Sequence, residues 1–159
     1  MKIKKLLTLL MVPFVCACQQ VPEYKGPKLV LDYVENGGLN EINPTQLYDL
    51  VITRGKDSFV LFSVEGCLSC EQAKTDLNSY GIGYHMNFYY VNMSTIEVNS
   101  NEYLKIVNTT TYLDSLYAFP EADKASYPLV YFFKERGVAL TRQTYLVDAL
   151  RQYVTTSND

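Results

Sequence analysis

An apolar strand that runs almost directly into two cysteines constrains this chain more than any other feature. Residues 58–64 are rich in β-forming side chains with little polar alternation, as in a strand buried on both faces of a sheet. Cys67 and Cys70 follow after a short connection and open a segment in which Ala73 and Leu77 recur at helical spacing. The pattern predicts an α/β fold with the cysteine pair where a central strand meets a helix.

This position favours dithiol chemistry for the pair. A helix N-terminus carries partial positive charge and free backbone N–H groups, so a cysteine there ionises more readily, and the thiolate is the form that attacks disulfides. The spacing also lets Cys70 close back onto Cys67. An inert structural disulfide is the alternative.

Metal binding is a poorer explanation of the two cysteines. Structural zinc needs four ligands, and His85 is the single histidine of the chain. We expect His85 to be a surface loop residue, and we expect the protein to use no metal and no organic cofactor.

The first residues have the pattern of an export signal. Lysines at positions 2, 4 and 5 precede an apolar run over residues 6–15, which is too short for an ordinary transmembrane helix. The segment then resembles a bacterial lipobox, with Ala17 directly before Cys18 and Val15 three residues before it. In such signals a peptidase cuts before the cysteine, which carries a diacylglycerol anchor, so the resemblance implies lipidation of Cys18. Cys16 departs from the usual pattern, and ordinary cleavage with release of the protein is the alternative.

These patterns divide the chain into three parts. Residues 1–17 are the expected lipoprotein signal peptide, residues 18–28 a polar tether with proline and glycine, and residues 29–159 one folded domain. The net charge of −3 becomes more negative when the lysines of the signal leave. An acidic domain is a poor candidate for nucleic-acid binding, so we expect no nucleic-acid partner.

Strand and helix patterns alternate through the domain. The expected strands cover residues 29–34, 58–64, 88–91, 129–133 and 138–140. Helices are expected from Asn43-Pro44, from the cysteine pair until Gly81 and Gly83, as two short pieces over 101–117, and over 145–153. This order implies a mostly parallel central sheet covered on both faces, with an antiparallel hairpin near the end.

With these elements placed, the chain resembles the thioredoxin superfamily over residues 29–154. The cysteine pair opens the second helix, Pro128 directly precedes the fourth strand where that family has a cis-proline, and Gly137 lies in the last hairpin turn. The resemblance implies a thioredoxin-like three-layer sandwich, with a central mixed sheet and helices on both faces. A narrower resemblance is to envelope lipoproteins of this fold, including accessory proteins of bacteriocin export, which also carry a signal segment and a CxxC.

The resemblance implies a role for each matched residue. Cys67 matches the exposed nucleophile, and Cys70 matches the buried thiol that resolves the mixed disulfide. Pro128 matches the cis-proline whose loop faces the active site, so that the backbone of Tyr127 would pair with a bound peptide. A trans proline at the start of a strand is the alternative for Pro128.

The chain also departs from the thioredoxins proper. Gly66 stands where the family usually has tryptophan, Leu61 where thioredoxins place a buried aspartate, and Leu68-Ser69 where they have Gly-Pro. Glu65 is an alternative proton carrier, although its charge would oppose thiolate formation.

The sequence therefore predicts a membrane-anchored thiol:disulfide oxidoreductase outside the cytoplasm of a bacterium. Its expected partners are protein thiols or disulfides of the cell envelope, a second redox protein that recycles the pair, and the membrane through its lipid. The alternative is a non-catalytic thioredoxin-fold lipoprotein that serves as a binding or accessory module, which the residues at Gly66 and Leu61 suggest.

Overall fold

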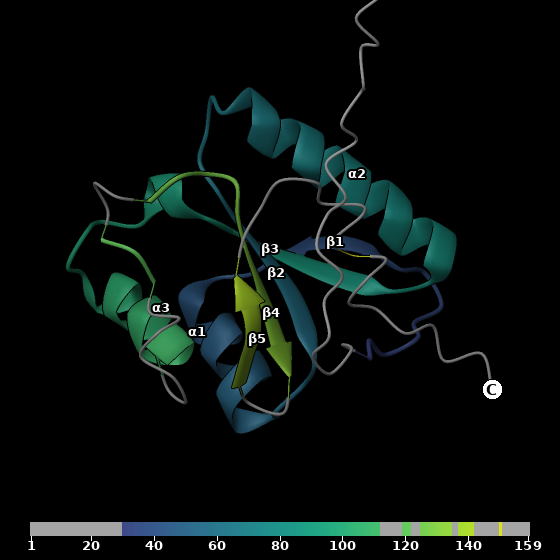
Figure 1. Cartoon of the computed structure of the whole chain (residues 1–159), viewed down its shortest axis with the longest axis horizontal. Helices are drawn as coiled ribbons and strands as arrows, with labels where there is room; N and C mark the ends of the chain where they lie inside the picture. Colours follow the sequence, from purple (N-terminus) through teal and green to yellow (C-terminus); the bar gives the residue numbers. More distant parts are fainter. Residues whose placement is uncertain (1–29, 112–118, 122–124, 135–136, 142–149, 151–159) are drawn as a thin grey trace, which may run out of the picture.

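A five-stranded mixed sheet forms the centre of the protein (Figure 1). The computed structural model describes residues 30–111, 119–121, 125–134, 137–141 and 150. The strands are β1 (Gly38–Glu41), β2 (Ser58–Ser63), β3 (Asn87–Asn92), β4 (Leu129–Lys134) and β5 (Gly137–Thr141). They lie in the order β1-β3-β2-β4-β5; β3 is parallel to both β1 and β2, whereas β4 is antiparallel to β2 and β5 to β4.

Helical segments lie between the first four strands along the chain. These segments are α1 (Pro44–Tyr48), the π-helical turn η1 (Asp49–Thr53), α2 (Leu68–Tyr84), the 3₁₀ turn η2 (Met93–Thr95) and α3 (Asn101–Thr111). Of the segment 101–117, predicted as two short helices, the structure describes one continuous helix up to Thr111, and residues 112–117 lie outside the described residues. The predicted C-terminal helix also lies outside them, except Leu150, which is helical and buried. Among the helices that the structure describes, none has both the length and the apolar character needed to cross a membrane.

Alternating side chains of β2 divide the core into two halves. Phe59 and Leu61 pack in the cluster that contains Ala73 and Leu77 of α2. Val60 and Phe62 point to the opposite face and join a cluster that includes side chains of α1, η1 and α3. The sheet therefore has helices on both faces, which confirms the predicted thioredoxin-like three-layer sandwich.

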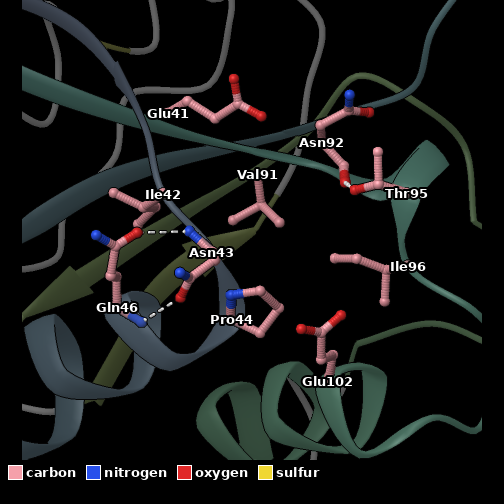
Figure 2. A pocket seen from close by; sticks show the side chains of 10 residues that line it. All are labelled: Glu41, Ile42, Asn43, Pro44, Gln46, Val91, Asn92, Thr95, Ile96 and Glu102. Atoms are coloured by element: carbon pink, nitrogen blue, oxygen red, sulfur yellow. Dashed lines mark hydrogen bonds between the residues drawn. The ribbon is translucent and has the colours of Figure 1, made fainter.

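The start of α1 follows from a reciprocal side-chain cap. The Asn43 side chain accepts a hydrogen bond from the Gln46 backbone N–H, and the Gln46 side chain accepts one from the Asn43 N–H, each at 2.9 Å (Figure 2). Pro44 occupies the first turn, where its missing N–H costs nothing. The predicted start of this helix is confirmed.

The predicted first strand over residues 29–34 is wrong. In the described part of this segment, Tyr33 makes one isolated antiparallel bridge to Met86. The edge position beside β3 belongs instead to residues 38–41, whose Gly38 pairs with Asn87. Apolar residues alone could not distinguish the two segments, because the choice depends on how closely the backbone must approach α2.

That close approach explains a glycine inside α2, where the sequence predicts the end of the helix. Gly81 and Gly83 lie inside the helix, which continues to Tyr84 and ends at His85 in the left-handed conformation, with φ of 54°. Gly81 packs backbone to backbone against β1: a Cβ on Gly81 would lie 2.7 Å from Gly38 Cα. A Cβ on the exposed Gly83 would meet nothing within 4 Å.

The two glycines give a matched test of this contact. Gly81→Ala should lower the free energy of unfolding by about 2 kcal/mol, because the added methyl has no space between α2 and β1. Gly83→Ala should raise it by about 0.5–1 kcal/mol, because alanine favours the helix and fits there. Urea unfolding of both variants measures the difference, and equal effects would contradict the packing.

Candidate active site

The connection from β2 to α2 places Cys67 at the N-cap of the helix. Its backbone is extended, with φ of −88° and ψ of 103°, and its Sγ accepts a hydrogen bond from the Cys70 N–H at 3.1 Å. Gly66 has φ of +74°, a conformation that side-chain-bearing residues rarely adopt. This turn gives a physical reason for glycine at position 66.

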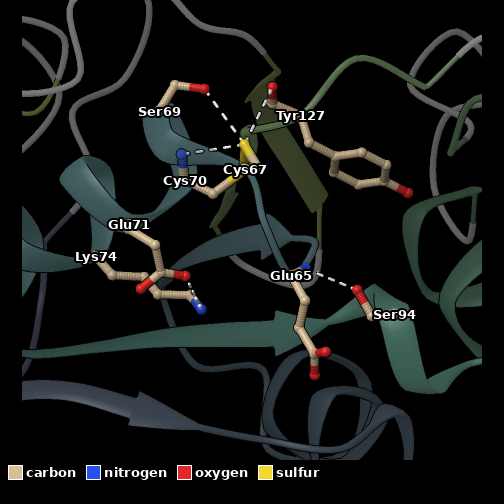
Figure 3. Close-up of a disulfide and its surroundings, with 8 residues drawn as sticks. All are labelled: Glu65, Cys67, Ser69, Cys70, Glu71, Lys74, Ser94 and Tyr127. Carbon is tan, nitrogen blue, oxygen red and sulfur yellow. Dashed lines mark hydrogen bonds and ion pairs between the residues drawn. A yellow bond between two sulfur atoms is a disulfide. The ribbon is translucent and has the colours of Figure 1, made fainter.

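Cys67 and Cys70 form a disulfide across the first turn of α2, with a Cα–Cα distance of 5.2 Å (Figure 3). The two cysteines differ in solvent exposure: Cys67 is partly exposed, whereas Cys70 is completely buried. An incoming thiolate can therefore reach Cys67 and not Cys70. After reduction, the helix N-terminus and the Cys70 N–H would both stabilise a thiolate on Cys67.

The loop before β4 faces the disulfide from the other side. The Tyr127–Pro128 peptide bond is cis, as expected from the resemblance, and the Tyr127 carbonyl oxygen lies 3.9 Å from Cys67 Sγ. Figure 3 shows the Tyr127 ring directed away from the sulfur. The ring instead packs at the edge of the cluster on the α1 and α3 face. Burial, reinforced by Tyr103, raises the pKa of the Tyr127 phenol, so the ring stays neutral.

Apolar packing replaces the acid that thioredoxins place near the buried cysteine. Leu61 is completely buried in the same cluster as Ala73 of α2, so its position offers no proton acceptor. Glu65 is an unsuitable substitute in this geometry, because its carboxylate points away from the disulfide (Figure 3). The same carboxylate accepts a hydrogen bond from Asn92 Nδ2 at 3.2 Å. The Glu65 N–H is held by Ser94 Oγ at 2.7 Å.

Ser69 is a further residue of the site, and the sequence pattern does not predict its position. Its Oγ lies 3.3 Å from Cys67 Sγ on an exposed part of the helix. With Cys67 reduced, this hydroxyl could donate to the thiolate, and a charge-assisted hydrogen bond favours the charged form. The sequence shows a hydroxyl residue between the two cysteines. Whether the Ser69 hydroxyl points towards Cys67 depends on its side-chain rotamer, which the sequence does not give.

The structure thus brings together four of the five predicted site residues: Cys67, Cys70, Tyr127 and Pro128. Cys18 lies outside the described residues. Within the part of the chain that the structure describes, no group of three or more His, Cys, Asp or Glu side chains could hold a metal ion. His85 caps the C-terminal end of α2, where its Nδ1 lies 2.9 Å from the Glu35 carbonyl oxygen.

No protein-family model and no curated protein sequence matches this chain. Among solved structures, it is similar to thioredoxin O1 of Arabidopsis thaliana in the oxidised state, with 15% identity and a TM-score of 0.48 over 72% of this chain and 92% of that one. The short form of thioredoxin F from spinach chloroplast gives 15% identity and a TM-score of 0.49, also over 72% and 92%. At this identity, neither structure assigns an activity to the chain.

Substitution of Ser69 tests the contact to Cys67. In reduced protein at pH 6, Ser69→Ala should slow alkylation of Cys67 by up to about tenfold, since a hydrogen bond to a charged group contributes about 1.5 kcal/mol. The rate at high pH, where the thiol is fully ionised, should not change. Ser69→Thr keeps the hydroxyl and should match the parent protein; slow alkylation of this variant, or a normal rate for Ser69→Ala, would refute the contact.

Proposed function

We propose that this protein is a thiol:disulfide oxidoreductase that acts on protein cysteines through Cys67 and Cys70. The observation that carries the proposal is the asymmetric disulfide at the start of α2: Cys67 is partly exposed, Cys70 is buried, and a backbone carbonyl lies beside Cys67. A disulfide that only held the fold together would connect distant segments, whereas this one closes a single helical turn.

The proposed exchange has two steps, one carried out by each thiol. In the reduced protein, the Cys67 thiolate attacks one sulfur of a substrate disulfide, forms a mixed disulfide and releases the other substrate sulfur as a thiolate. Cys70 then loses its proton and attacks Cys67 Sγ, which closes the Cys67–Cys70 bond and releases the second substrate thiol. Two electrons have passed to the substrate, and the reverse sequence oxidises a dithiol.

Each direction needs a second redox protein to restore the starting state. The loop at Tyr127 would position the substrate, because its carbonyl beside Cys67 can accept a backbone N–H of an extended peptide. The ring of Tyr127 would not take part, since it packs on the other side.

The proposed location is the outside of a bacterial membrane, with the protein held by lipid on Cys18. The basic start, the short apolar run and the Ala17-Cys18 junction support this proposal. The anchor would keep the domain close to envelope proteins, at the end of the tether over residues 18–28. An accessory role in bacteriocin export is the narrowest form of this proposal.

A non-catalytic binding module is the second candidate function. The observation that favours it is Leu61, because the buried position next to α2 carries no group that could take the proton of Cys70. In this hypothesis, the fold would present a surface to a partner protein and the disulfide would stay closed.

Variants of the two cysteines separate these candidates. Reduced Cys70→Ser protein, mixed with a model protein disulfide, should form a stable mixed disulfide through Cys67, because the resolving thiol is absent. Cys67→Ser should form none, because Cys70 is buried. Non-reducing electrophoresis measures the adduct, and its absence with Cys70→Ser, together with no exchange by the parent protein, would favour the binding module.

The same variant in cells tests the location. Adducts of Cys70→Ser should be found with envelope proteins in the membrane fraction, and adding Cys18→Ser should move the protein out of that fraction. Retention of the Cys18→Ser protein in the membrane would refute the lipid anchor and leave the redox proposal intact.

A further inference from the structure

Among the residues that the structure describes, one buried side-chain oxygen has no hydrogen-bond partner: Ser63 Oγ, at the end of β2. Ser63 is completely buried. A buried hydroxyl without a hydrogen bond destabilises a fold, because it has lost its bonds to water without replacing them. Alanine would fill nearly the same space without this cost, so the hydroxyl needs a reason other than packing.

The Ser63 side chain points to the face of the sheet that α2 covers. Side chains alternate between the two faces along a strand, and Phe59 and Leu61 pack in the cluster that contains side chains of α2. The next residue, Val64, packs instead against the cluster on the opposite face. Ser63 therefore continues the row of Phe59 and Leu61 on the α2 face.

Cys70 lies on the face of α2 that packs on the sheet. The buried residues of α2 recur at helical spacing and are Cys70, Ala73, Leu77 and Gly81. Because α2 connects the parallel strands β2 and β3, it runs back along the sheet from their carboxyl ends (Figure 1). The first turn of α2 therefore lies at the same end of the sheet as Ser63.

The register of the sheet puts Cys70 at the level of Ser63. Gly81 packs against the first residue of β1, which pairs with Asn87 at the start of β3. From Gly81 back to Cys70, eleven helical residues span about 16 Å. From Asn87 to Asn92, which pairs with Ser63, five strand residues also span about 16 Å. The buried hydroxyl and the buried sulfur thus lie at one level of the same layer.

The neighbours of Ser63 within the sheet do not compete for its hydroxyl. Asn92, opposite Ser63 in β3, donates from Nδ2 to Glu65 Oε1 and accepts at Oδ1 from a backbone N–H of η2. On the other side of β2, the residue before β4 is Pro128, whose nitrogen carries no hydrogen.

Reduction changes what the Cys70 sulfur can accept. In the closed disulfide the sulfur is a weak acceptor, so the hydroxyl gains little from it. Opening the disulfide leaves a thiol and, once the proton is lost, a thiolate that accepts a charge-assisted hydrogen bond. The hydroxyl of Ser63, unpaired in the oxidised protein, would then be paired in the reduced one.

We propose that the Ser63 hydroxyl donates a hydrogen bond to the Cys70 thiolate and so assists resolution of the mixed disulfide. Cys70 gives its proton to water, its sulfur bonds to Cys67 Sγ, and the bond from Cys67 to the substrate sulfur breaks. The electron pair leaves with that substrate sulfur, which takes up a proton from water. The hydroxyl keeps its own proton throughout and is not a general base. This role rests on the proposed oxidoreductase function.

Exchange with one equivalent of a nitrobenzoate disulfide tests the role. Reduced protein releases one coloured thiolate when Cys67 attacks the reagent, and a second when Cys70 resolves the mixed disulfide. At pH 7, Ser63→Ala should leave the first phase unchanged and slow the second about tenfold, the effect of one hydrogen bond to a charged group. The midpoint of the pH profile of the second phase should rise by about one unit. The two proteins should converge where Cys70 is fully ionised.

Two further variants separate the hydroxyl from packing. Ser63→Thr keeps the hydroxyl and should retain the parent pH profile. Ser58→Ala is the matched control, because Ser58 is also completely buried in β2 but donates to the Lys56 carbonyl oxygen at 2.8 Å. Ser58→Ala should lower the urea midpoint of the oxidised protein and leave both phases unchanged. Ser63→Ala should not lower that midpoint, because the hydroxyl it removes has no partner there.

The possible results separate this role from the proposed function. The Ser63 role is wrong, and the oxidoreductase stands, if Ser63→Ala resolves at the parent rate across the pH range. It is also wrong if Ser63→Thr behaves like Ser63→Ala, or if Ser63→Ala destabilises the oxidised protein as much as Ser58→Ala does. If the parent protein releases no second thiolate, the proposed function itself fails.

Discussion

Complete burial of β2 at the centre of the sheet is the constraint on which the rest of the structure depends. All six of its residues are buried, with alternate side chains in two separate clusters. A strand with two apolar faces needs helices on both sides, which produces the three layers. β2 ends at the edge of the sheet where Cys67 caps α2, and Pro128 precedes β4 at the same edge. The buried strand therefore positions both the cysteine pair and the loop that faces it.

Strong patterns made the fold predictable from the sequence, and close backbone contacts made parts of it unpredictable. The capped start of α1 and the apolar runs of β2 and β4 were read correctly because each signal is local. The apolar character of residues 29–34 predicts the first strand there, whereas Gly38–Glu41 occupies the edge of the sheet. Gly81 predicts a helix end, but it lies within α2, because the helix contacts Gly38 there.

In the candidate site, too, local patterns predict some residues, whereas others depend on packing. Cys67 and Cys70 could be found from spacing and their position after a strand, and the cis bond before Pro128 from the resemblance. The direction of the Tyr127 ring and the Ser69 contact depend on rotamers and packing, which no local pattern encodes.

The central claim is that the Cys67–Cys70 disulfide opens and closes as a working redox pair. Equilibration of the protein in glutathione buffers of defined potential, followed by alkylation of free thiols, tests this claim most directly. We expect a reversible two-electron transition between about −270 and −120 mV, the span of redox-active pairs of this kind. A disulfide that remains closed below about −300 mV would be structural and would contradict the account.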